Sequence, residues 1–168
     1  ACGIVGVYAP GEDVARVTFF GLYALQHRGQ ESAGIASGDG ARIKVRTALG
    51  LVGQAFQEED LESLDGHLAV GHTRYSTTGS NRLSNAQPIL SRHDGIEIAL
   101  AHNGNVINAV KLKRELTEWG CTFSSTSDSE IIAHLLTHAP ASSWAERIAY
   151  SMRRLEGAYS LVVMTPDA

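Results

Sequence analysis

The stretch that most constrains the fold is residues 1–7, a short apolar strand that begins at Cys2 and contains Gly3 and Gly6. Terminal residues usually fray, whereas a buried strand here would hold the start of the chain and a thiol in the interior. Such a cysteine could be a nucleophile whose proton is removed by the α-amine of the same residue. Because the amine and the thiol titrate near ~8 and ~8.5, a proton can pass between them at little cost. The alternative is a buried strand with an inert cysteine.

Length and composition narrow the class of protein. A chain of 168 residues, 43% hydrophobic and 19% charged, is typical of one soluble globular domain. A net charge of -4 gives no reason to expect nucleic acid or an anionic membrane as a partner. No apolar run approaches a spanning helix and no signal peptide precedes Cys2, which predicts a cytoplasmic protein. Two cysteines without CxxC spacing predict neither a disulfide framework nor a metal site, and Cys121 is interpreted as a buried hydrophobe.

Alternating and helical apolar patterns follow one another along the chain. They predict strands over residues 33–36, 41–48, 67–73, 89–90, 96–101 and 158–164, and helices over about 13–25, 58–64, 106–118 and 144–154. Another helix should begin at Ser127, with Glu130 at capping-box spacing, and Ser143 with Glu146 repeats that pattern. Gly120 would end the helix before it as a C-cap. Hairpins with helices grouped between them predict an α+β fold, and the turn signal at residues 165–168 predicts that the fold continues beyond them.

Three polar segments are candidates for function. Residues 26–32 are wholly polar and lead into a small-residue strand that could lie beside Cys2. Arg74 lies where a strand ends and the loop of residues 74–81 begins. It is either a surface charge or a guanidinium that binds a carboxylate through two hydrogen bonds. Asn103-Gly104 is a common turn dipeptide, yet a side-chain amide and a backbone N–H there could form an oxyanion hole. Asp128 can equally be part of a helix start.

Taken together, these features resemble one family, the glutamine amidotransferases of the N-terminal-nucleophile type. Five motifs carry the resemblance in order. They are Cys2-Gly3-Ile4-Val5-Gly6, His27-Arg28-Gly29-Gln30 with Ser32-Ala33-Gly34, Gly71-His72-Thr73-Arg74-Tyr75-Ser76-Thr77, His102-Asn103-Gly104-Asn105, and Ser127-Asp128-Ser129-Glu130. Residues 25–34, Tyr75 and Asn85-Ala86-Gln87-Pro88 look most like the glutaminase part of the amidophosphoribosyltransferases. The whole chain, residues 1–168, is thus interpreted as one glutamine amidotransferase domain.

The resemblance implies a four-layer αββα sandwich and an enzyme that hydrolyses L-glutamine to glutamate and ammonia through a cysteine thioester. It implies a role for each matched residue. Cys2 would be the nucleophile, Asn103 and the Gly104 N–H would stabilise the oxyanion, Arg74 would bind the substrate carboxylate, Asp128 would bind its ammonium, Thr77 would contact the substrate, and Arg28 would organise the surroundings of Cys2. Free glutamine is a zwitterion, so an arginine and an aspartate suit its two charges. The segment of residues 74–81 would close over bound glutamine.

The resemblance also implies what lies beyond this domain. Ammonia would pass to a C-terminal phosphoribosyltransferase domain, absent here, where it would meet phosphoribosyl pyrophosphate and Mg²⁺ and give phosphoribosylamine, the first step of purine biosynthesis. The full-length chain would be a homo-oligomer. No cofactor is implied for residues 1–168, and an iron–sulfur cluster further along is left open. Fructose 6-phosphate or aspartate is the alternative acceptor, and a non-catalytic glutamine-binding module is the alternative of another class.

Ala1 departs from the family pattern, because a cysteine nitrogen in a peptide bond cannot act as a base. We expect Ala1 to be the last residue of a propeptide or of an unprocessed form, and glutaminase activity to be low until it is cleaved. His72 and His102 lie inside motifs, but the seven histidines lack carboxylate clusters. They are assigned to packing and hydrogen bonding, and no metal site is predicted.

Overall fold

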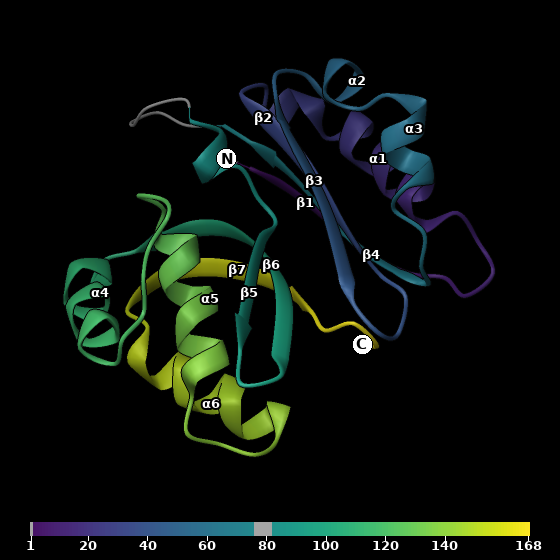
Figure 1. The fold of residues 1–168 in the computed structure, drawn as a ribbon. Coiled ribbons are helices and arrows are strands. Elements are labelled where there is room, and N and C mark those ends of the chain that lie inside the picture. Colours follow the sequence, from purple (N-terminus) through teal and green to yellow (C-terminus); the bar gives the residue numbers. More distant parts are fainter. Residues whose placement is uncertain (1, 76–81) are drawn as a thin grey trace.

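A computed structural model describes residues 2–75 and 82–168 of the chain, which form two antiparallel sheets (Figure 1). One sheet has the order β1-β4-β2-β3, with β1 at Gly3–Tyr8, β2 at Ser32–Gly38, β3 at Ile43–Leu49 and β4 at Leu68–Arg74. The other has the order β5-β6-β7, with β5 at Ile89–His93, β6 at Ile96–Val106 and β7 at Gly157–Met164. Strands β4 and β6 contact each other, so the two sheets pack face to face.

Helices cover the outer face of each sheet, and the predicted four-layer αββα sandwich is confirmed (Figure 1). Helix α1 (Val14–Ala24) packs on β1, β4 and β2, beside the short helices α2 (Val52–Ala55) and α3 (Glu58–Glu62). Helix α5 (Asp128–His138) packs on β5 and β6, flanked by α4 (Ala109–Glu118) and α6 (Trp144–Arg154). Two 3-10 turns occur at Gln26–Arg28 and Leu83–Asn85. No helix of the described residues is long and apolar enough to cross a membrane.

The hydrophobic core divides into three clusters that match the three interfaces between the four layers. Between α1 and its sheet, the cluster includes Ala15, Leu22, Ile35 and Leu64. Between the two sheets, it includes Ala36, Leu68, Val70, Ala99, Ala101 and Met164. Between the second sheet and its helices, it includes Ile98, Leu100, Leu116, Ile132 and Leu135. The middle interface is rich in small residues, which let the sheets approach closely.

Strand β2 shows how residue size fixes this approach. All seven of its residues are buried, because it lies between β4 and β3 and is covered on both faces. A side chain on Gly34 would place its Cβ 2.0 Å from the carbonyl oxygen of Gln87. The Ala-Gly-Ile-Ala pattern of this strand therefore brings residues 85–87 against the first sheet, beside the end of β4.

Most element boundaries agree with the sequence, and α1, α6 and the β5–β6 hairpin lie where they are predicted. Gly120, with φ of +93°, ends α4 as expected: its N–H donates to Thr117 O, and the N–H of Cys121 donates to Leu116 O. Strand β6 is longer than predicted and runs through residues 102–106, so α4 begins at Ala109. Asn103-Gly104, a common turn dipeptide, does not form a turn here, because β7 pairs with β6 along this whole stretch.

The predicted capping box at α5 is half right. Ser127 is the N-cap, and its side chain accepts a hydrogen bond from Ser129 N. The carboxylate of Glu130, however, accepts four hydrogen bonds from the N–H and hydroxyl groups of Ser124 and Ser125. Burial acts to raise the pKa of Glu130, but these hydrogen bonds outweigh it and the pKa is lowered. The segment before α5 folds back over the helix start, which the local pattern does not reveal.

Candidate active site

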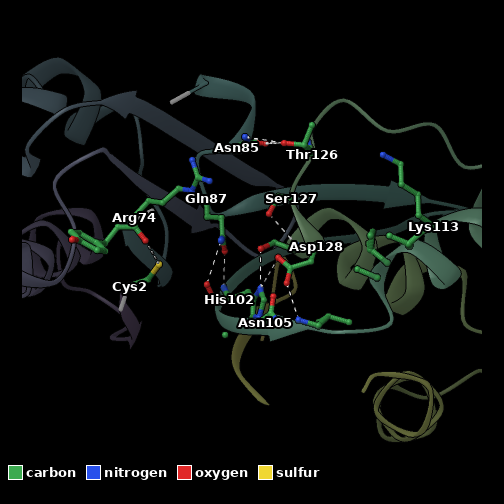
Figure 2. Close-up of a pocket in the computed structure, with 17 residues that line it drawn as sticks. Cys2, Arg74, Asn85, Gln87, His102, Asn105, Lys113, Thr126, Ser127 and Asp128 are labelled. Atoms are coloured by element: carbon green, nitrogen blue, oxygen red, sulfur yellow. Dashed lines mark hydrogen bonds and ion pairs between the residues drawn. The ribbon is translucent and has the colours of Figure 1, made fainter. Parts of the chain in front are cut away.

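A pocket of about 870 Å³ opens where β4, β6 and the start of α5 meet (Figure 2). Its lining includes four residues predicted from the sequence, namely Cys2, Arg74, Gly104 and Asp128. Figure 2 shows Cys2 and Arg74 at one side of the pocket and Asp128 across it. Two of the remaining predicted residues, Asn103 and Arg28, contact Cys2 directly. The last, Thr77, lies outside the described residues, as do Ala1 and most of the 74–81 loop.

Cys2 is held from three directions at the head of β1. Its backbone N–H donates to Asn103 Oδ1 at 3.3 Å, and its carbonyl oxygen accepts from Arg28 Nε at 3.1 Å. The next residue, Gly3, donates its N–H to Thr73 Oγ1 at 3.2 Å, and a Cβ on Gly3 would lie 2.7 Å from the same oxygen. The thiol is half-buried, and its sulfur lies 3.8 Å from the carbonyl oxygen of Tyr75. Both ends of the Cys2 backbone are thus fixed while the sulfur faces the pocket.

Asn103 and Gly104 lie within β6, opposite Ser160 and Tyr159 of β7. Gly104 has φ of +153°, and a Cβ there would lie 2.3 Å from Ala158 O, so this position requires glycine. The absence of a side chain leaves backbone at the pocket wall. Since the oxygen of the Asn103 amide faces Cys2, its NH₂ group remains available as a donor.

Arg74 is the last residue of β4, and only 16% of its side chain is exposed. Its partner, which the sequence did not indicate, is Glu31, whose Oε2 lies 3.8 Å from Arg74 Nη1. The backbone reinforces the pair, because Glu31 N–H donates to Arg74 O at 3.1 Å. At 3.8 Å the ion pair is too long for a hydrogen bond, so Glu31 offsets the charge without occupying the guanidinium donors. The guanidinium fork can therefore still bind an anion in the pocket.

Asp128 is the first residue of α5, and its carboxylate is fixed from the β6 side. Asp128 Oδ2 accepts from Val106 N at 3.0 Å, and Oδ1 lies 3.6 Å from His102 Nδ1. The side chain keeps 23% of its surface exposed toward the pocket. Arginine on one side and aspartate on the other give the pocket two opposite charges, which suits a zwitterionic ligand.

Beneath the pocket, a buried hydrogen-bond network centred on Gln87 joins the two sheets. Gln87 belongs to the Asn85-Ala86-Gln87-Pro88 motif, but the sequence alone indicated no role for it. The Gln87 amide accepts from His102 N at 2.7 Å and donates to His102 O at 3.3 Å. That oxygen also lies 3.1 Å from His72 Nε2, which donates to it. His102 Nδ1 lies 3.0 Å from Ser129 Oγ. The assignment of both histidines to packing and hydrogen bonding therefore agrees with the geometry.

The environment of these histidines keeps them neutral. Burial lowers the pKa of His72 to about 4. Burial also lowers the pKa of His102, although the Asp128 carboxylate opposes that shift. A neutral imidazole offers one donor and one acceptor, which suits a structural link better than an exchangeable charge.

A family model described as a glutamine amidotransferase domain matches residues 72–168, more than half of the chain. The chain belongs to the glutamine amidotransferase family. Among curated proteins, an amidophosphoribosyltransferase of Synechococcus elongatus is 52% identical over 170 residues, which cover 100% of this chain and 34% of that protein. One from Mycobacterium tuberculosis is 47% identical, covering 97% of this chain and 32% of that protein. The chain spans about a third of the length of these relatives.

Solved structures agree with these relatives. The structure described as the allosteric regulatory enzyme of purine biosynthesis matches with a TM-score of 0.91 and 38% identity, over 99% of this chain and 36% of the other. The glutamine phosphoribosylpyrophosphate amidotransferase of B. subtilis, complexed with ADP and GMP, matches with a TM-score of 0.88 and 37% identity. The match covers 99% of this chain and 35% of the other. The resemblance inferred from five motifs is confirmed over the whole chain.

Proposed function

We propose that this chain is the glutaminase domain of an amidotransferase and that it hydrolyses L-glutamine to glutamate and ammonia. The observation that carries the proposal is the pocket itself, in which a half-buried thiol, an arginine and an aspartate converge from three distant parts of the sequence. Arg74 would bind the α-carboxylate of glutamine through its fork, and Asp128 would bind the α-ammonium. That places the side-chain amide of the substrate toward Cys2.

The reaction would proceed through a thioester. The Cys2 sulfur forms a bond to the amide carbon of glutamine, and its proton passes to the α-amine of the same residue. The oxygen of the tetrahedral intermediate becomes negative and accepts hydrogen bonds from the Asn103 NH₂ group and the Gly104 N–H. The carbon–nitrogen bond then breaks, and the protonated amine returns the proton to the departing ammonia. Water finally cleaves the thioester and releases glutamate. Arg28 would act as a positioning residue through the Cys2 carbonyl.

This mechanism requires a free amine on Cys2, so we propose that Ala1 is removed before the enzyme turns over. The hydrogen bond from Cys2 N to Asn103 Oδ1 supports a role for that nitrogen, because the contact would hold a free amine in place. Intact mass and ammonia release should be measured on the same samples. We expect turnover in chains that begin at Cys2 and little in chains that retain Ala1. Full turnover with Ala1 retained would refute the amine as the base.

Cys2→Ser tests the glutaminase proposal, with ammonia release from glutamine as the measurement. We expect a loss of about 10³-fold or more, because the nucleophile is removed. A glutamine-like electrophile should label Cys2, and peptide mapping against Cys121, the other cysteine of the chain, is the internal control. Binding of glutamine without ammonia release or labelling would indicate a non-catalytic binding module instead.

In the complete protein, we propose that ammonia reacts with phosphoribosyl pyrophosphate to give phosphoribosylamine, the first step of purine biosynthesis. The names and lengths of the relatives support this acceptor and a phosphoribosyltransferase domain after residue 168. That domain would use Mg²⁺ and the complete protein would form a homo-oligomer, whereas the glutaminase reaction needs no cofactor. The two free cysteines favour the reducing cytoplasm.

The acceptor is tested by supplying the complete protein with glutamine, Mg²⁺ and one of three acceptors. We expect glutamine-dependent release of pyrophosphate with phosphoribosyl pyrophosphate. Product formed from fructose 6-phosphate or aspartate, with none from phosphoribosyl pyrophosphate, would overturn this part of the proposal and leave the glutaminase intact.

A further inference from the structure

A second group of reactive side chains lies on the helical side of the second sheet, away from the pocket. Cys121, just after α4, faces His134 and His138 of α5, and one ligand atom from each residue lies within 4.8 Å of the others. Figure 1 shows α4 and α5 side by side on this layer. None of the three residues lines the pocket, and the proposed glutaminase reaction uses none of them.

Cys121 is held rigidly in this group. Hydrogen bonds from Gly120 N to Thr117 O and from Cys121 N to Leu116 O fix the backbone, and the residue is only 6% exposed. A cation bound to the sulfur would release the thiol proton, because the thiolate is the form that ligates metals.

His134 and His138 have i, i+4 spacing and project from the same face of α5. His138 Nδ1 lies 2.9 Å from the carbonyl oxygen of His134 and must donate to it, which leaves the lone pair on Nε2. A carbonyl partner on the other ring nitrogen is the usual arrangement for a histidine that binds a metal. The ring of His93 stacks on His138, with centroids 3.6 Å apart, and limits its rotation.

His134 has an unused ring nitrogen. Its Nδ1 is buried and has no hydrogen bond of good geometry with a described residue, although the Thr122 backbone lies near the ring, and such a condition is costly for a polar atom. Its other nitrogen, Nε2, lies 3.9 Å from Glu130 Oε1, so a carboxylate faces the side of the ring away from Nδ1. The edge of Phe123 packs against the ring, with centroids 4.9 Å apart. A metal ion on Nδ1 would satisfy this atom.

We propose that Cys121, His134 and His138 bind a zinc-class divalent ion, with water as the fourth ligand. One thiolate and two imidazoles are the donors that Zn²⁺ and Co²⁺ prefer. Tetrahedral coordination with bonds of about 2.0–2.3 Å separates the ligand atoms by roughly 3.5 Å, so the side chains need to close by about 1 Å. The thiol proton is released to solvent as the sulfur–metal bond forms. The ion would join the end of α4 to α5, the helix whose first residue is Asp128.

The site is tested with Co²⁺, whose bond to a thiolate gives a charge-transfer band in the near ultraviolet. Because Cys2 also carries an accessible thiol, the titration uses Cys2→Ser as the parent protein. We expect one Co²⁺ per chain with a thiolate band in the parent, and loss of that band in Cys121→Ser and in His138→Gln. The matched control is His67→Gln, just before β4 of the other sheet, which should bind Co²⁺ as the parent does.

A thermal measurement distinguishes a built site from loose binding. Zn²⁺ at about 100 times its Kd should raise the Tm of the parent by roughly 5 °C or more, and that of His138→Gln much less. His138→Gln serves as the second variant because its ring is partly exposed and its replacement should leave the protein folded. A thiolate band that persists in Cys121→Ser, an equal Zn²⁺ response in His138→Gln, or no Co²⁺ binding by the parent would each overturn the proposal.

Discussion

Replacing Gln87 by methionine tests whether the buried network beneath the pocket holds the second sheet in place. Strand β5 pairs Ile89 with Leu100, and continuing that register would place Gln87 opposite His102. Strand β5, however, begins only at Ile89. The Gln87 side chain supplies the donor and the acceptor that a strand neighbour would supply, at 3.3 Å and 2.7 Å from the His102 backbone.

The expected cost follows from what the methionine leaves behind. Both residues are nearly inaccessible, with Gln87 5% and His102 2% exposed, so water cannot replace the lost partner. The His102 N–H would be left without an acceptor, which costs about 1–3 kcal/mol. The His102 oxygen keeps the hydrogen bond from His72, so losing the second bond costs about 0.5–1.5 kcal/mol. Methionine has nearly the same length, so a cavity adds little.

We therefore expect Gln87→Met to lower the free energy of unfolding by about 2–4 kcal/mol and the Tm by roughly 5–15 °C. Urea unfolding followed by circular dichroism measures the first, and a thermal scan the second. Gln54→Met, at an exposed position of α2, is the matched control and should change stability by less than about 0.5 kcal/mol. A shift of the His102 backbone would also displace Asn103, the next residue and a proposed oxyanion donor. Ammonia release should therefore fall as well, by roughly tenfold. A Gln87→Met protein as stable as the Gln54→Met control would refute the reasoning.

Three further predictions concern single residues of the site. Burial lowers the pKa of His72 to about 4, whereas an unfolded histidine titrates near ~6.5, so the unfolded chain takes up the proton first as the pH falls. The free energy of unfolding should therefore fall by roughly 3 kcal/mol between about pH 6.5 and pH 4. In urea titrations at several pH values, His72→Gln should show a smaller loss over this range. Gly104→Ala should destabilise by at least about 3 kcal/mol, because the new Cβ would lie 2.3 Å from Ala158 O, whereas Gly95→Ala, also at positive φ but with open space around it, should cost about 1–2 kcal/mol in the same assay. Asp128→Asn should raise the KM for glutamine by about tenfold or more through the lost ion pair, and an unchanged KM would remove Asp128 from the substrate site.

The fold and the main residues of the site could be predicted because their signals are local and ordered. Cys2, Arg74 and Asp128 each follow or precede a strand or helix that the apolar pattern reveals, and the motif order brings them into one pocket. Their partners were harder to find. Glu31 reaches Arg74 because β2 pairs with β4, and Gln87 reaches His102 because it precedes β5, which pairs with β6. Neither residue belongs to a pattern that predicts its contact.

The errors have the same origin. Asn103-Gly104 has the composition of a turn, but pairing with β7, more than fifty residues later, keeps it extended. Glu130 has capping-box spacing, but two serines that fold back over the helix start take its carboxylate. The prediction that the chain has no metal site is not one of these errors; the sequence offers only the i, i+4 spacing of His134 and His138 in favour of the site proposed above.

The position of the nucleophile depends on strand register more than on any single contact. Strand β1 pairs Gly3 with Thr73, so Cys2 falls opposite Arg74, at the end of β4. A slip of one residue would turn every side chain of β1 to the other face of the sheet. Gly6 opposes this slip, because a Cβ at this position would lie 3.3 Å from Val162 Cγ1 of the second sheet and a larger residue would meet that side chain. Gly3 also opposes the slip, because the Thr73 hydroxyl occupies the space that a side chain on residue 3 would need. The two glycines near the start of the chain therefore oppose a register slip that would separate the thiol from the arginine.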